Sequence, residues 1–273
     1  MIGDTFSENK KSLRERMPGA YGNFAQVYDL FMDNVPYEEW CRYLTGILRE
    51  YGIGDGLILD LGCGTGKMTR LLAAQGYDMI GADASDEMLN IALDEGAEGI
   101  LYLQQDMRAF ELYGTVRAVV SVCDCMNYIL EEEELRQVFA LVNNYLDPGG
   151  IFIFDMNTVH QYREELGNQT ICENREQASF IWENEFDPGR MINTYALTLF
   201  IEETPGLYRK YEELHVQRAW EQEEVVRLLA GAGLEVLAVY GEGTKEPPAA
   251  DCARMYFVAR EKGKRKRLFG KKK

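Results

Sequence analysis

Short runs of apolar residues alternate with amphipathic stretches between residues 57 and 155. The apolar runs, such as Leu57–Leu61 and Ala118–Val122, are typical of buried strands, and the stretches between them have helical spacing. The expected order is strand 57–61, helix 66–75, strand 78–83, helix 86–95, strand 100–104, strand 116–122, helix 131–145 and strand 151–155. Such alternation predicts an α/β fold: a doubly wound, mostly parallel sheet with helices on both faces.

The pattern changes on both sides of this region. Residues 21–32 and 36–51 precede it with helical spacing. Residues 158–220 follow it with three β-prone runs, 179–186, 191–201 and 207–220, separated by two Pro-Gly turns. We expect an inserted antiparallel β-meander. Helix 221–231, strand 234–240 and strand 255–260 then complete a seven-stranded sheet, the last two strands as an antiparallel hairpin.

These patterns divide the chain into four parts. The core comprises residues 57–157 and 221–261, an N-terminal helical segment comprises 1–56, and the inserted sheet comprises 158–220. A basic tail, 262–273, is expected to be disordered. The insertion could cover a site, pair with its copy in a homodimer, or do both.

Charge separates the tail from the rest of the chain. Eight of the 29 Lys and Arg residues lie in 262–273, so the first 261 residues combine 21 basic with all 45 acidic residues. An acidic body repels phosphate backbones, which argues against nucleic acid as the main partner and favours small or cationic ones. The tail alone could contact RNA or an anionic surface.

Cysteine and histidine usage indicates neither a disulfide framework nor a metal site. The six cysteines lack Cys-x-x-Cys spacing, and the chain has two histidines. No apolar run reaches about 18 residues, so we expect no membrane span. Reduced thiols and the absence of a signal-peptide pattern favour a cytoplasmic protein.

The candidate chemistry begins where the first strand ends. Asp60 and the glycines Gly62, Gly64 and Gly66 directly precede a helix, an arrangement that lets a ligand approach the backbone beside the helix N-terminus. Asp83 ends the second strand about 20 residues later, where a carboxylate accepts hydrogen bonds from ribose hydroxyls. Helix N-capping is the structural alternative for Asp83, but Ser85 is also available for that role.

With these residues in place, the chain resembles the class I S-adenosylmethionine-dependent methyltransferases. Leu59–Gly66 resembles the first motif of that family, Gly81–Met88 the second, Gln105–Met107 the adenine-contacting segment and Leu146–Gly150 the turn into strand five. The resemblance implies the family's Rossmann-like fold and S-adenosylmethionine as cofactor, with S-adenosylhomocysteine as product. It also implies that the N-terminal helical segment covers the cofactor as a lid.

The resemblance implies particular cofactor contacts. Asp60 would bind the methionine amino group beside Gly62, Cys63 and Gly64. Asp83 and Ala84 would lie at the ribose, Met88 near the adenine, and Asp106 and Met107 would pair with the adenine ring. Cys123 would border the methyl group, and the narrower resemblance to small-molecule methyltransferases, including deoxyamino-sugar N-methyltransferases, adds Tyr28 and Trp40 from the lid.

The acceptor side is less defined. In-line methyl transfer needs alignment more than a nucleophilic side chain. If the acceptor must lose a proton, Asp124, Tyr128 and His160 are candidate bases by position, whereas His215, inside a predicted strand, is expected to be structural. We expect a small-molecule acceptor.

Three alternatives stay open. RNA or protein recruited by the basic tail could be the acceptor, or the chain could bind S-adenosylmethionine without catalysis. A nicotinamide-dependent oxidoreductase shares the sheet and the acidic residue, but it expects Gly-x-Gly-x-x-Gly, which this loop lacks.

Overall fold

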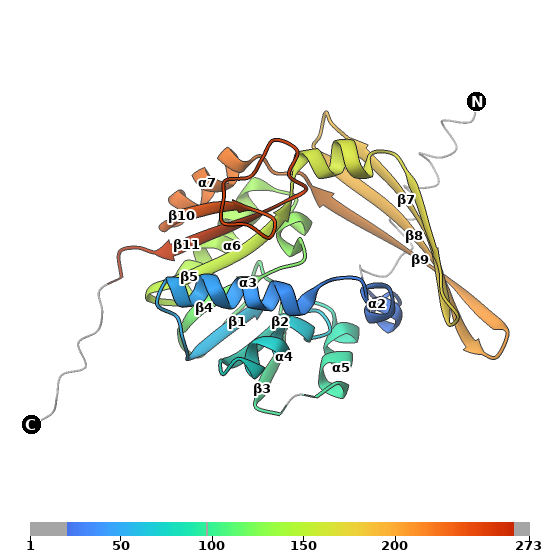
Figure 1. Cartoon of the computed structure of the whole chain (residues 1–273), viewed down its shortest axis with the longest axis horizontal. Coiled ribbons are helices and arrows are strands. Elements are labelled where there is room, and N and C mark those ends of the chain that lie inside the picture. Colours follow the sequence, from blue (N-terminus) through green and yellow to red (C-terminus); the bar gives the residue numbers. More distant parts are fainter. Residues whose placement is uncertain (1–20, 97, 265–273) are drawn as a thin grey trace, which may run out of the picture.

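The computed structural model describes residues 21–96 and 98–264, which form two sheets. The larger sheet has seven strands in the order β10-β11-β5-β4-β1-β2-β3 (Figure 1). Neighbouring strands are parallel except β11, which runs antiparallel to both β5 and β10, as the expected hairpin requires. The strands are β1 Leu57–Leu61, β2 Asp78–Asp83, β3 Ile100–Gln104, β4 Val116–Ser121, β5 Leu146–Asn157, β10 Leu234–Gly241 and β11 Arg254–Glu261. The doubly wound seven-stranded sheet is confirmed.

Helices cover both faces of this sheet because each strand carries apolar side chains on both sides. On one face, helices α3 (Tyr37–Glu50) and α4 (Lys67–Ala74) pack on residues such as Ile58 and Val120. On the other face, α6 (Glu132–Tyr145) and α7 (Gln222–Gly231) pack on residues such as Leu59 and Phe154. A further helix, α5 (Asp86–Asp94), connects β2 to β3.

The order of the strands determines where a ligand can bind. From β1 the chain continues to β2 and β3 on one side, and it then returns to β4 on the other side of β1. Open α/β sheets form a crevice at the carboxyl ends of the strands where the order reverses in this way. The loops after β1, β2 and β4 therefore meet at one place.

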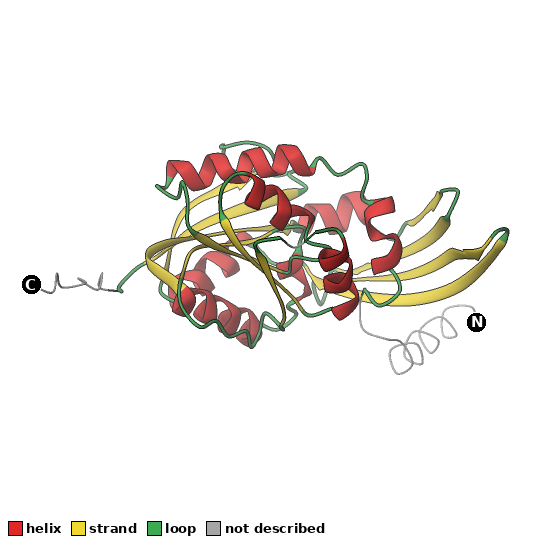
Figure 2. Ribbon diagram, turned by 90° about the horizontal axis from the view of Figure 1, so that it is seen from below, coloured by secondary structure: helices red, strands yellow, loops and turns green. Residues whose placement is uncertain are grey.

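The inserted sheet has four strands, one more than the sequence pattern predicts. Its strands are β6 Thr170–Asn174, β7 Ala178–Asp187, β8 Ile192–Thr204 and β9 Leu207–Arg218. They pair in sequence order as an antiparallel meander that projects from one end of the core (Figures 1 and 2). The pattern misses β6 because this five-residue edge strand pairs only with β7 and has little apolar alternation. A helical turn, η2 (Gln161–Leu166), leads into it.

The first helix is shorter than expected. Residues 21–32 were expected to be helical, but α2 spans Ala25–Phe31, and Tyr21 has a φ of 69° that a helix does not allow. Both oxygens of Glu213, on β9, accept backbone N–H groups from Tyr21, Asn23 and Phe24 at 2.6–3.0 Å. The inserted sheet thus caps this helix and holds the chain before it in a turn.

The basic tail falls mostly outside the described residues, which end at Lys264. The Lys264 ammonium group donates to the carbonyls of Asn144 and Leu146, each at 2.8 Å, at the end of α6. Such a cation stabilises the negative end of a helix dipole. Within the described ranges, no helix is both long and apolar enough to cross a membrane.

Candidate functional site

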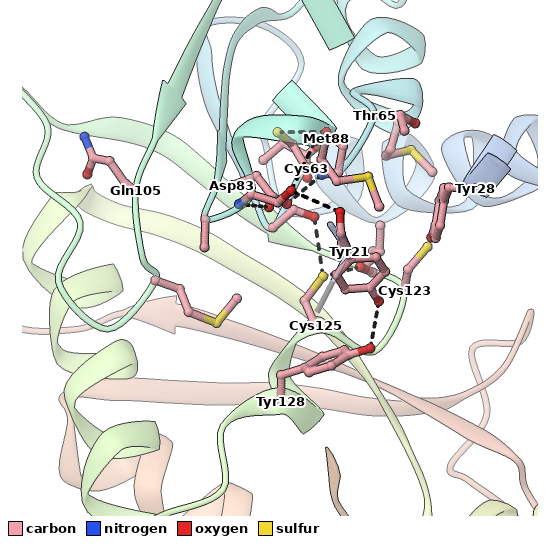
Figure 3. A pocket seen from close by; sticks show the side chains of 18 of the residues that line it. Tyr21, Tyr28, Cys63, Thr65, Asp83, Met88, Gln105, Cys123, Cys125 and Tyr128 are labelled. Atoms are coloured by element: carbon pink, nitrogen blue, oxygen red, sulfur yellow. Dashed lines mark hydrogen bonds between the residues drawn. The ribbon is translucent and has the colours of Figure 1, made fainter. Parts of the chain in front are cut away.

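A cavity of about 650 Å³ lies at the carboxyl ends of β1, β2 and β4. Its walls come from the loops after those strands, from the segment after β3, and from α2 and α3 above (Figure 3). Eleven of the twelve residues that the sequence assigns to the cofactor line it: Tyr28, Asp60, Gly62, Cys63, Gly64, Asp83, Ala84, Met88, Asp106, Met107 and Cys123.

Trp40 does not line the cavity. Tyr37, one turn earlier on α3, occupies that wall, and Trp40 packs beside it with a ring separation of 5.8 Å. The Arg254 guanidinium instead lies over the Trp40 ring, 5.5 Å from the ring centre. The expected cofactor contact of Trp40 is therefore not supported, because its neighbour Tyr37 faces the cavity.

The glycine loop brings backbone close to the cavity. The N–H groups of Gly62 and Cys63 both donate to the Ala82 carbonyl, at 2.7 and 3.1 Å, which fixes the turn against β2. A Cβ on Gly62 would lie 2.7 Å from the Cys125 sulfur, so packing excludes a side chain there. Gly64, with a φ of 54°, has open space where its Cβ would be. A ligand can therefore approach the backbone at Gly64.

Two carboxylates lie behind this loop. Asp83 accepts the N–H of Gly64 at 2.8 Å and that of Ser85 at 2.9 Å, and burial raises its pKa. Ser85 itself caps α5 by accepting the Met88 N–H. Asp60 is 1% exposed and accepts the Thr69 hydroxyl at 2.6 Å. Burial raises the pKa of Asp60 to about 7.

The far end of the cavity is formed by the segment after β3. Met107 and Met88 provide apolar surface there. Asp106 forms a two-oxygen ion pair with Arg108, whose hydrogen bonds lower the pKa of the Asp106 carboxyl. The backbone N–H of Arg108 also donates to Asp106 at 2.8 Å, so Arg108 occupies most of the acceptor capacity of this carboxylate. A flat, apolar group fits this end.

Tyrosines cover the opposite side of the cavity. Tyr21, Tyr28 and Tyr37 come from the turn before α2, from α2 and from α3. The Tyr28 ring lies edge-on to Tyr21 with centroids 5.9 Å apart, and the Lys67 ammonium group lies 4.5 Å from the Tyr37 ring centre. Burial raises the pKa of all three phenols. They provide neutral aromatic surface that favours cations.

The loop after β4 adopts an unusual conformation. Cys123 and Asp124 have φ values of 63° and 52°, the left-handed region that residues with a Cβ rarely adopt. Buried Asp155 holds this turn by accepting both N–H groups, at 3.1 and 2.7 Å. The turn directs Cys123 to the cavity and is followed by η1 (Cys125–Tyr128), which places Tyr128 in the wall.

Of the three candidate bases, only Tyr128 lines the cavity. The Asp124 carboxylate is turned away, since it accepts Gln217 at 2.7 Å and Arg254 at 2.9 Å. His160 lies before η2, with its Nε2 3.5 Å from a Glu165 oxygen, and does not line the cavity. Asp124 and His160 are thus in the wrong place to contact an acceptor bound in this cavity.

His215 lies inside a strand, as expected, but its partners could not be predicted from the sequence. This fully buried residue of β9 lies with its Nδ1 2.9 Å from the Tyr128 hydroxyl and its Nε2 3.3 Å from Glu213. Burial by itself would raise the pKa of Glu213, but hydrogen bonds from His215, Phe24 and Asn23 lower it below its usual value. No local sequence pattern indicates the contact between His215 and Tyr128, because the two residues are 87 positions apart in the chain.

Comparison with known proteins agrees with this geometry. A methyltransferase domain family matches residues 58–150. A putative methyltransferase of Geobacillus sp. (strain WCH70) is 32% identical over 247 residues, covering 88% of this chain and 99% of that protein. This chain is a class I S-adenosylmethionine-dependent methyltransferase.

Two further relatives of this methyltransferase differ in how far the similarity extends. The crystal structure of an S-adenosylmethionine-dependent methyltransferase from Clostridium acetobutylicum superposes with a TM-score of 0.79 at 26% identity, covering 90% of this chain and all of the other. The dTDP-3-amino-3,4,6-trideoxy-alpha-D-glucopyranose N,N-dimethyltransferase of Streptomyces venezuelae is 30% identical over 133 residues, 48% of this chain and 56% of that enzyme. Because the chain belongs to the methyltransferase family, the nicotinamide-dependent oxidoreductase alternative is excluded.

Proposed function

We propose that this methyltransferase transfers a methyl group to the nitrogen of a small-molecule amine. The observation that carries the proposal is the composition of the cavity wall. The side next to Cys123 is covered by tyrosine rings, and no basic side chain of the described residues other than Lys67 and Arg108 lines the cavity. Aromatic faces attract cations, so an ammonium group is favoured over an anionic acceptor.

The residues of the wall fit S-adenosylmethionine. In the proposal, Asp60 pairs with the methionine ammonium group, the open backbone at Gly64 lies along the cofactor, and Asp83 accepts the ribose hydroxyls. Met88, Asp106 and Met107 hold the adenine. When bound, S-adenosylmethionine supplies a methyl group that the positive sulfonium has already activated. The protein then has mainly to align the acceptor, which contributes up to about 7–11 kcal/mol.

The size and the relatives support a small acceptor. About 650 Å³ lies within the range of about 300–1,000 Å³ typical of cofactor and small-molecule sites. The Streptomyces relative acts, by its name, on an amino group of a nucleotide sugar. We propose that residues 21–56 act as a lid, since Tyr21, Tyr28 and Tyr37 cover the cavity.

Transfer of tritium from methyl-labelled S-adenosylmethionine tests the proposal. The full chain is incubated with a deproteinised low-molecular-weight fraction of a bacterial extract, with the RNA fraction or with the protein fraction. We expect label in small molecules, lost when the amines of that fraction are first acetylated and lost in Asp83→Ala. Label confined to RNA or protein would instead favour recruitment by the basic tail, and label that survives acetylation would exclude an amine.

A further inference from the structure

A chain of hydrogen bonds leads from the cavity to a buried carboxylate. The Tyr21 hydroxyl lies 2.8 Å from that of Tyr128, which lies 2.9 Å from Nδ1 of His215. Nε2 of His215 lies 3.3 Å from Glu213. Both side chains at the inner end, His215 and Glu213, are completely buried. These hydrogen bonds thus connect the cavity to a buried carboxylate that does not line it (Figure 3 draws Tyr21 and Tyr128).

The carboxylate gives this chain a direction when the imidazole is neutral. An ionised carboxylate only accepts, so His215 donates through Nε2–H. In the neutral form of the imidazole, Nδ1 is an acceptor, and Tyr128 donates to it. The Tyr128 oxygen in turn accepts from Tyr21 and from Tyr195, whose hydroxyls lie at 2.8 and 2.7 Å. With these directions, the hydroxyl protons of Tyr21 and Tyr195 point to Tyr128, and the Tyr128 proton points to His215.

The same assignment identifies the group that contacts the acceptor. The Tyr128 oxygen donates one hydrogen bond and accepts two, which uses its full capacity. Tyr21 donates to Tyr128 and keeps the lone pairs of its own oxygen. Tyr21 lines the cavity. Tyr195 also bonds to Tyr128, but Tyr195 does not line the cavity. Tyr21 is thus the member of the network that can accept a proton from a ligand.

We propose that Tyr21, Tyr128 and His215 form a proton relay that deprotonates the ammonium group of the acceptor; this rests on the proposed amine specificity. Tyr21 is the catalytic residue, and Tyr128 and His215 act through it. The ammonium proton passes to the Tyr21 oxygen as the Tyr21 proton moves to Tyr128 and the Tyr128 proton moves to Nδ1 of His215. The imidazolium formed is stabilised by Glu213, as in nucleophile–base–orienter arrangements.

The freed nitrogen lone pair then forms the N–C bond to the methyl carbon while the C–S bond breaks, its electrons staying on sulfur. The product amine carries the positive charge. The proton on His215 returns along the relay to solvent after the product leaves, so one proton is released for each methyl transferred. No oxidant or metal is required.

The tautomer of His215 tests the direction of the relay without any acceptor. Long-range ¹H–¹⁵N spectra of the labelled full chain resolve both imidazoles, and His160→Gln assigns them. The relay requires that His215 is protonated at Nε2 and unprotonated at Nδ1. The ¹⁵N resonance of Nδ1 should shift in Tyr128→Phe, which removes its hydrogen-bond donor. A proton on Nδ1 would mean that His215 donates to Tyr128, which would overturn the proposal.

A matched pair of variants tests the catalytic role. Tyr21→Phe and Tyr195→Phe each remove one hydroxyl bonded to Tyr128, but only the first interrupts the path from the cavity. With the low-molecular-weight amine fraction and saturating S-adenosylmethionine, we expect Tyr21→Phe to lower the turnover by about 100-fold. We expect Tyr195→Phe to stay within about fivefold of the wild type.

Equal losses in the two variants, or none in Tyr21→Phe, would overturn the relay and leave a structural role for the network. If the wild type itself labels nothing in the amine fraction, the proposed function fails instead. The tautomer measurement still decides the direction of the hydrogen bonds in that case, so the two failures are distinguishable.

Discussion

Asp60 provides a sharp test because its protonation should be coupled to cofactor binding. Burial raises the pKa of this carboxyl to about 7, so without ligand it is half protonated near neutral pH. An ammonium group of the cofactor would pair only with the ionised form. Binding must therefore release a proton from Asp60 whenever the pH is at or below that pKa.

The magnitudes follow from the pKa. With a value of about 7, binding releases about 0.5 proton at pH 7 and nearly one (about 0.97) at pH 5.5. The binding-competent, ionised fraction falls from about 0.5 to about 0.03 over the same range, so the affinity should fall about 16-fold. Over this range the α-amino group of the ligand, with a pKa of about 7.7–8.0, stays mostly protonated.

Isothermal titration calorimetry in pairs of buffers that differ in ionisation enthalpy measures the released protons. Asp60→Asn, which keeps the size and an acceptor oxygen for Thr69, is the matched control. It should bind more weakly and without proton release between pH 5.5 and 7. If wild type and Asp60→Asn release the same number of protons, Asp60 does not pair with the cofactor and this assignment is wrong.

Three further predictions concern the scaffold. Gly46→Ala, at an exposed helical position of α3 with open space around it, should raise the free energy of unfolding by about 0.5–1 kcal/mol in chemical denaturation. Arg254→Met should lower the free energy of unfolding by about 3–5 kcal/mol, because the buried Asp155 carboxylate loses its ion pair at 3.0 Å. An unchanged denaturation midpoint would contradict this prediction. Gly62→Ala should lower both the melting temperature and the affinity for S-adenosylmethionine, because its Cβ would lie 2.7 Å from Cys125 at a φ of 82°, a strain of about 1–3 kcal/mol. Normal cofactor affinity in Gly62→Ala would show that the loop tolerates movement there.

The sequence predicts the core because each of its elements carries a local signal. The expected strands 57–61, 78–83 and 100–104 coincide with β1, β2 and β3, since each is a short apolar run between turns. Residues that line the cavity from one continuous loop, such as Gly62 and Gly64, could be predicted because the loop lies between a strand and a helix and resembles the first motif of the family. Local periodicity and turn chemistry are sufficient where the relevant residues are neighbours in the chain.

The parts that could not be predicted depend on contacts between distant segments. The helix α2 begins at Ala25 because Glu213, about 190 residues later, binds the N–H groups before it. His215 reaches Tyr128 only because the inserted sheet folds back onto the core. Tyr37 and Trp40 lie one turn apart on α3, but Tyr37 lines the cavity and Trp40 packs against Arg254. Tertiary packing decides these details.

The measurement that tests the central claim most directly is calorimetric titration of the purified chain with S-adenosylmethionine and S-adenosylhomocysteine, beside NADH, repeated on Asp83→Ala. We expect micromolar binding of both sulfur compounds, no binding of NADH, and loss of binding in Asp83→Ala. Binding of NADH alone, or equal binding of S-adenosylmethionine by wild type and Asp83→Ala, would contradict the assignment of this cavity.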